Sequence, residues 1–222
     1  MQPYADRRDA GRRLGAALAQ YREAGPVVIG LPRGGVVVAA EVARSLGAPL
    51  DVMVTRKIGA PFNPEFAIGA VAPGVVHLDD ATVEALAIPR DYIDRSVARE
   101  QEVARRREAR LREGRAGLDV AGRTVIVVDD GLATGATAIA AIVALRQMYP
   151  GKIVVAVPVG APDTVARLRN RADDVVCLQT PTAFRAVGQA YVDFTPVEED
   201  EVIRLLQTHA PPTGPASPRA RL

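Results

Sequence analysis

Apolar residues in this chain form two kinds of stretch, which alternate along most of its length. Short continuous apolar runs predict buried strands, at 26–31, 50–56, 124–130, 152–159 and 174–178. Apolar residues at helical spacing predict helices, at 5–22, 36–47, 90–113, 137–149, 164–172 and 198–207. This alternation predicts an α/β fold: a single Rossmann-like domain with a mostly parallel central sheet flanked by helices.

The stretch from 57 to 74 departs from this pattern, because it holds three glycines and three prolines. Closely spaced glycines and prolines break regular structure and predict a loop, with a short hairpin at 66–71 as the alternative. A long loop inside a compact α/β domain is more often functional than idle.

We expect one domain over residues 1–208, with its core at about 26–180. A helical insertion at about 75–118 carries one long charged helix, and a C-terminal extension follows the core. Residues 209–222 are rich in proline and predict a disordered tail.

Composition narrows the class of protein. The 222 residues include one cysteine, Cys177, which excludes an internal disulfide framework and a cysteine-based zinc cluster. No apolar run reaches the roughly 18 residues that a membrane-spanning helix needs. The first residues, MQPYADRRDAGRR, lack the apolar segment of a secretory signal. We therefore expect a cytoplasmic protein without a membrane partner.

Charge is informative only in its distribution. The chain has 28 basic and 26 acidic residues, and only Lys57 and Lys152 are lysines. Residues 90–115 hold nine arginines and six acids, so the net charge of +2 can be assigned to this helix. It is either a solvated helix with internal ion pairs or a surface for nucleic acid. The interleaved acids favour the first interpretation, so we do not expect a nucleic-acid partner.

Ligands of parallel sheets bind beyond the C-terminal ends of the strands, which selects residues 32–35, 57–69 and 129–137. The last is part of VIVVDDGLATGAT, in which a buried strand ends at Asp129 and Asp130. The following turn opens a helix, whose N-terminal N–H groups bind phosphate well. The carboxylates suit sugar hydroxyls or a hydrated divalent cation. The segment therefore predicts a sugar-phosphate site, and its spacing excludes a Walker P-loop and a dinucleotide fingerprint.

This segment resembles the PRPP-binding motif of type I phosphoribosyltransferases. The resemblance implies that Asp129 and Asp130 hold the ribose hydroxyls. It also implies that the 5-phosphate is cradled by Gly131, Leu132, Ala133, Thr134, Gly135, Ala136 and Thr137. The stretches RKIGAPFNPEFAIGAV and YVDF are most similar to a bacterial branch of the family, a likeness that implies no particular acceptor.

Two further segments are similar to loops of the same family. GLPRGG resembles the pyrophosphate loop, formed here by Pro32, Arg33, Gly34 and Gly35, and implies a cis peptide bond between Pro32 and Arg33. The stretch from residue 55 to 71 resembles the mobile catalytic loop.

The implied reaction transfers the 5-phosphoribosyl group of PRPP to a nitrogen acceptor, such as a nucleobase, with Mg²⁺ present and pyrophosphate released. Asp129, Asp130, Arg56 and Lys57 would be the catalytic residues, Mg²⁺ would contact the protein mostly through substrate and water, and the chain could form a homodimer.

The acceptor is the open question. Purine-transferring members of one type carry a carboxylate where this chain has Ala133, so the loop looks more like the adenine type. Candidates for the acceptor pocket are Glu65, Tyr191, Asp193 and Phe194. The alternative function is a non-catalytic regulator or sensor of the same fold that binds PRPP or a nucleotide and could also bind nucleic acid through the helix at 90–115.

Overall fold

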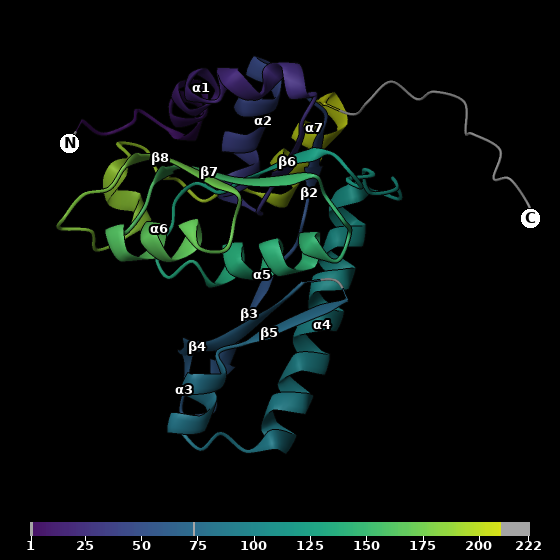
Figure 1. Cartoon of the computed structure of the whole chain (residues 1–222), viewed down its shortest axis with the longest axis vertical. Coiled ribbons are helices and arrows are strands. Elements are labelled where there is room, and N and C mark those ends of the chain that lie inside the picture. The colour runs from purple at the N-terminus through teal and green to yellow at the C-terminus, as the bar shows by residue number, and fades with distance from the viewer. Residues whose placement is uncertain (1, 73, 210–222) are drawn as a thin grey trace, which may run out of the picture.

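The computed structural model describes residues 2–72 and 74–209, apart from the side chain of Glu65. Its main sheet has five parallel strands in the order β2-β1-β6-β7-β8 (Figure 1). They are β1 (Val27–Gly30), β2 (Leu50–Val52), β6 (Thr124–Val128), β7 (Lys152–Val159) and β8 (Asp174–Gln179). The predicted α/β fold with a parallel central sheet is confirmed.

Helices cover both faces of this sheet (Figure 1). One face packs against α1 (Arg7–Ala17), α2 (Gly34–Leu46) and α7 (Glu199–Thr208), and the other against α5 (Ala136–Arg146) and α6 (Pro162–Arg169). Two 3₁₀ turns, η1 (Ala19–Ala24) and η2 (Val187–Ala190), complete the connections. Because both faces are buried, successive strand residues enter opposite cores, which explains the continuous apolar runs.

The prediction of a loop at 57–74 was wrong, and the residues of its alternative, a short hairpin at 66–71, lie within one strand. The chain there forms a second, antiparallel sheet of β3 (Arg56–Ala60), β4 (Asn63–Ala72) and β5 (Val75–Leu78). The strand predicted at 50–56 is also shorter than expected. β2 stops at Val52, and Arg56 is the first residue of β3.

Glycine hid this sheet from the sequence pattern. A Cβ at Gly59 would lie 2.4 Å from the carbonyl oxygen of Pro64, and one at Gly69 would lie 2.4 Å from that of His77. These glycines therefore admit close backbone approach within a sheet, where the sequence pattern suggested turns.

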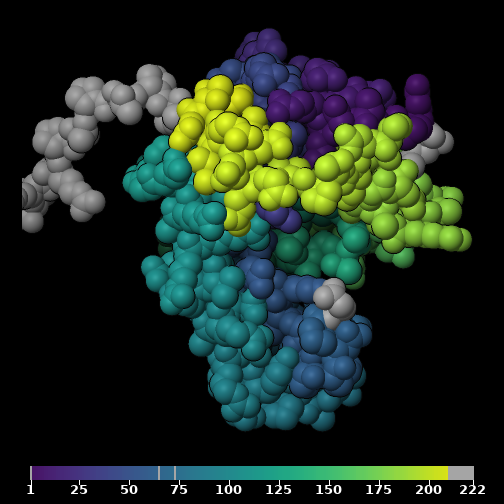
Figure 2. Space-filling model, turned by 180° about the vertical axis from the view of Figure 1, so that it is seen from behind, coloured from purple at the N-terminus to yellow at the C-terminus, as the bar shows by residue number. Residues whose placement is uncertain are grey.

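The second sheet and two helices form a lobe beside the main sheet (Figures 1 and 2). The helices are α3 (Asp80–Ala85) and α4 (Arg90–Arg112), and α4 confirms the helix predicted at 90–113. The expected insertion at 75–118 thus begins inside the second sheet. The predicted disordered tail lies, from residue 210 on, outside the described residues. No helix in the described ranges combines the length and the apolar composition that crossing a bilayer requires.

A buried ion network ties α4 to the main sheet. Arg112 Nε lies 3.0 Å from Asp51 Oδ1, and Arg112 Nη1 lies 2.5 Å from Glu108 Oε1. The backbone N–H groups of Val54 and Leu118 donate to Glu108 and Asp51 at 3.0 and 2.9 Å. Because both carboxylates are buried, Arg112 is the counter-charge that makes their burial tolerable.

We therefore expect Arg112→Met to lower the free energy of unfolding by about 3 kcal/mol, since it leaves two buried carboxylates without their cation. Arg95→Met is the matched control, because Arg95 pairs with Asp91 on an exposed part of the same helix. The control should cost less than about 1 kcal/mol. Urea unfolding of both variants measures the difference, and equal losses would contradict the role assigned to the network.

Candidate active site

The site begins where two neighbouring strands end. Gly30 of β1 lies opposite Val128 of β6, and the N–H of Leu31 donates to the carbonyl of Val128 at 2.9 Å. The turn at 32–35 and the loop at 129–137 therefore leave the sheet side by side, at its carboxyl edge.

Two glycines let the turn press directly against the carboxylates. A Cβ at Gly34 would lie 1.9 Å from Asp130 Oδ2, and a Cβ at Gly35 would lie 2.8 Å from the Cα of Asp129. No other residue type fits at either position without moving the Asp pair. The peptide bond between Pro32 and Arg33 is cis, as the resemblance implies.

The two carboxylates interact with each other. Asp129 Oδ1 accepts a hydrogen bond from the N–H of Asp130 at 2.9 Å. Both side chains keep some accessible surface. The protein around Asp129 is nevertheless dense, and this burial is the largest cause that raises its pKa well above the usual range. The charge of Asp130 raises this pKa further.

Arg7 is a site residue that the sequence did not reveal. Its Nε lies 2.8 Å from Asp130 Oδ2, and its Nη1 donates to the carbonyl of Thr195 at 2.9 Å. Its guanidinium carbon lies 3.8 Å from the ring centroid of Phe194, a cation–π contact. No spacing links Arg7 to Asp130, which lies 123 positions further along the chain.

Of the four predicted acceptor residues, Tyr191 contacts Asp130, whereas Phe194 packs on Tyr191 and Arg7. Tyr191 donates its hydroxyl to the carbonyl of Asp130 at 2.5 Å, and its ring lies 5.0 Å from that of Phe194. Burial raises the pKa of Tyr191, so its hydroxyl remains a donor. Asp193 is exposed and accepts from the N–H and hydroxyl of Thr195. The side chain of Glu65 lies outside the described part of the chain.

The loop after the carboxylates leads into α5. Gly135 is the N-cap of α5, with φ at +75°, and no side chain in the described ranges caps this helix. The helix therefore presents its first N–H groups to the loop. Leu132 anchors the loop to the end of β7, because its N–H donates to Val159 and its carbonyl accepts from Ala161, both at 2.9 Å.

Comparison with known proteins identifies the family. The family model of the phosphoribosyl transferase domain matches residues 4–195. The chain belongs to this family. The sequence is 50% identical over 208 residues to two Mycobacterium tuberculosis proteins, named "Putative phosphoribosyl transferase MT0597" and "Putative phosphoribosyl transferase Rv0571c". This match covers 93% of the chain and 47% of each relative, so the chain spans about half the length of these curated relatives.

A solved structure also resembles nearly the whole chain. The protein TT1426 from Thermus thermophilus is 47% identical, with a TM-score of 0.82, over 95% of this chain and 100% of that one. The likeness therefore includes the second sheet and α4 as well as the phosphoribosyl transferase core.

The basic residues among the predicted site residues do not share one element: Arg33 precedes α2, whereas Arg56 and Lys57 lie on β3. Arg33 is exposed in the turn that contacts the carboxylates, with Nη1 4.0 Å from Glu198 Oε2. Arg56 opens β3 and faces α4, where its Nη2 lies 2.8 Å from the largely buried carboxylate of Glu100. Lys57 is exposed on β3, opposite Ala70 of β4.

The site fits a divalent cation only if the substrate shares it. Phosphoribosyltransferases of this fold typically use Mg²⁺, which prefers oxygen ligands and keeps several waters. The described residues contain no group of three or more His, Cys, Asp and Glu side chains placed to hold a metal. Asp129 and Asp130 would supply carboxylate oxygens, and substrate and water would supply the rest.

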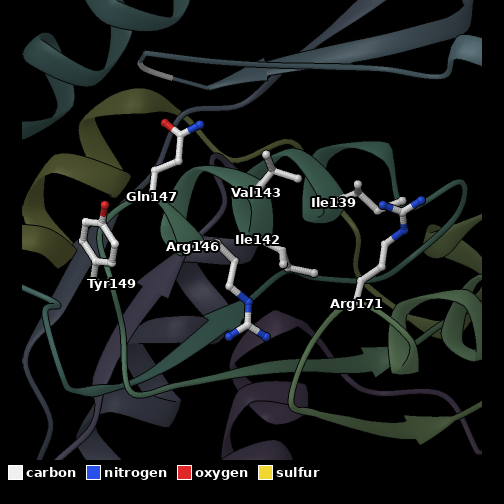
Figure 3. Close-up of a pocket in the computed structure, with 7 residues that line it drawn as sticks. All are labelled: Ile139, Ile142, Val143, Arg146, Gln147, Tyr149 and Arg171. Atoms are coloured by element: carbon white, nitrogen blue, oxygen red, sulfur yellow. The ribbon is translucent and has the colours of Figure 1, made fainter.

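Two cavities lie along α5. One of about 560 Å³ lies between β4, β5 and the loop, and is lined in part by Phe66, His77, Thr134 and Arg167. Another, of about 740 Å³, follows the outer face of α5 (Figure 3). Its lining contains none of the predicted site residues and consists of Ile139, Ile142, Val143, Arg146, Gln147, Tyr149 and Arg171.

The raised pKa of Asp129 predicts that this residue costs stability at neutral pH. The unfolded chain ionises at the usual pKa, near 4, whereas the folded chain holds the proton to higher pH, so stability falls as pH rises between the two values. We expect Asp129→Asn to raise the thermal midpoint at pH 7, and the gain to vanish towards pH 4. A pH-independent difference between the two proteins would contradict this assignment.

Proposed function

We propose that this chain is an enzyme that transfers the 5-phosphoribosyl group of PRPP to a nitrogen acceptor and releases pyrophosphate. One observation carries the proposal: the glycine turn at 32–35 is packed directly against Asp129 and Asp130, at the point where the loop after these residues leads into the N-terminus of α5. A sugar phosphate that also carries a pyrophosphate group has hydroxyls for the carboxylates, a phosphate for the loop and a pyrophosphate for the turn.

The proposed pose follows from the charge of each part. The ribose hydroxyls would donate to the oxygens of Asp129 and Asp130, for which Asp129 must give up its proton and Asp130 must share its contact with Arg7. The 5-phosphate would accept from the N–H groups at 131–137. The pyrophosphate would lie over 32–35, beside the exposed guanidinium of Arg33.

The chain's main work in this reaction is placement and charge neutralisation. The bond from C1 to pyrophosphate breaks while the acceptor nitrogen bonds to C1, so charge builds on the leaving group. Arg33 and Lys57 would neutralise this charge, and Arg56 would contribute after leaving Glu100. When bound, Mg²⁺ would supply further neutralisation of the pyrophosphate oxygens.

The acceptor would bind on the side of the Asp pair formed by Tyr191, Phe194 and Arg7. Ala133 offers no carboxylate at the position where some relatives handle the acceptor's proton. We therefore propose an acceptor that gives up its proton without help from this loop. The pocket belongs to one phosphoribosyltransferase domain over 1–208, with the second sheet and α4 as its inserted part.

A role in nucleic-acid binding, considered as the alternative, finds little support in α4. Its arginines are paired with acids along the helix or on α7: Arg90 with Asp94, Arg95 with Asp91, Arg105 and Arg106 with Glu102, and Arg107 and Arg110 with Glu199. Such internal pairs leave little net attraction for phosphates.

The decisive experiment measures pyrophosphate released from PRPP, with Mg²⁺, across a panel of nucleobases and amines. We expect release with one class of acceptor. The double variant Asp129→Asn, Asp130→Asn should lower this rate by about 100-fold or more, because it removes the negative charge of both carboxylates that would accept from the ribose hydroxyls.

Asp91→Asn is the control for that variant, since Asp91 is exposed on α4 and should leave the rate unchanged. PRPP binding without pyrophosphate release across the whole panel would contradict the enzymatic function and favour the non-catalytic sensor. Undiminished release by the double variant would overturn the site itself.

A further inference from the structure

Helix α6 contacts the loop at 131–135, the proposed phosphate loop, from the side. The hydroxyl of Thr164 donates to the carbonyl of Ala133 at 2.7 Å, and Arg167 Nη2 donates to the carbonyl of Thr134 at 3.0 Å. Arg167 Nη2 also lies 3.2 Å from Thr164 Oγ1. Two consecutive carbonyls of the loop are therefore held by two residues one turn apart on the same helix.

These bonds fix the direction of the loop's N–H groups. In a planar trans peptide, the C=O and the following N–H point in opposite directions. Holding the carbonyls of Ala133 and Thr134 towards α6 therefore turns the N–H groups of Thr134 and Gly135 away from it. In the part of the chain that the structure describes, no oxygen accepts a hydrogen bond from either N–H.

Thr164 is fitted to this task. It is buried, with 4% of its surface exposed, although it is polar and lies in the first turn of α6. Its methyl group occupies the space that a side chain at Gly135 would need, since a Cβ there would lie 2.7 Å from Thr164 Cγ2. Arg167 donates to the Thr164 oxygen, which leaves the hydroxyl proton to point at Ala133.

We propose that Thr164 and Arg167 are positioning residues: they hold two loop carbonyls so that the N–H groups of Thr134 and Gly135 face the 5-phosphate before the substrate arrives. Neither side chain needs to touch the substrate. The inference rests on the proposed function, because it assumes that the loop binds the 5-phosphate. It adds that α6, a helix outside the recognised loops, sets the affinity for that group.

The test measures the dissociation constants of ribose 5-phosphate and of pyrophosphate by calorimetry. Thr164→Val keeps the shape of the side chain and removes its donor. We expect it to raise the dissociation constant of ribose 5-phosphate about three- to tenfold, the effect of one lost hydrogen bond, and to leave that of pyrophosphate unchanged. Thr164→Ser keeps the hydroxyl and should restore most of the affinity.

Arg167→Gln is the second variant, and Arg169→Gln is its control, since Arg169 is exposed on the same helix and has no contact with the loop's carbonyls. Equal ribose 5-phosphate affinity in Thr164→Val and the unaltered protein, at an unchanged thermal midpoint, would overturn the positioning role alone. Weaker binding of both ligands by Thr164→Val, together with a lowered thermal midpoint, would show that Thr164 stabilises the fold and would also overturn the positioning role. No ribose 5-phosphate binding by the unaltered protein would overturn the proposed function with it.

Discussion

The rest of the site depends on one close approach, between the glycine turn after β1 and the carboxylates after β6. The backbone of the turn lies where any side chain at Gly34 or Gly35 would collide with Asp130 or Asp129. This approach places two acids in dense surroundings, where burial and the charge of Asp130 raise the pKa of Asp129. Such a cluster lowers stability. In our account its use is binding: the carboxylates would accept from the sugar hydroxyls of PRPP, and the neighbouring backbone would bind its phosphate groups.

The surrounding elements hold this arrangement from three directions. Helix α1 brings Arg7 to Asp130, the segment after η2 brings Tyr191 to the backbone of the same residue, and α6 holds the loop before α5 through Thr164. Each contact joins parts of the chain far apart in sequence. The site is therefore prepared by the packing of whole helices, which is how an α/β scaffold achieves positional accuracy.

Much of this could be predicted from the sequence. The apolar runs located the parallel strands, because strands buried on both faces carry uninterrupted apolar residues. The acidic motif and the PRGG turn were recognisable since their chemistry is local. Arg7 and Thr164 were not, because a lone arginine or threonine on a helix gives no sign of which distant carbonyl or carboxylate it meets.

The second sheet was missed for a different reason. Gly59 and Gly69 normally mark turns, but here they allow neighbouring strands to approach. The same sheet starts with Arg56, whose pairing with Glu100 keeps one expected catalytic cation on α4 rather than at the Asp pair. Arg33 thus lies beside the main sheet, whereas Arg56 and Lys57 lie on the second sheet.

A crystal structure with PRPP and Mg²⁺ bound would test the central claim most directly. Our account predicts the 5-phosphate at the N-terminus of α5, the ribose hydroxyls on Asp129 and Asp130, and the pyrophosphate over the turn at 32–35. PRPP bound elsewhere, for example in the groove along the outer face of α5, with the Asp pair untouched, would contradict it.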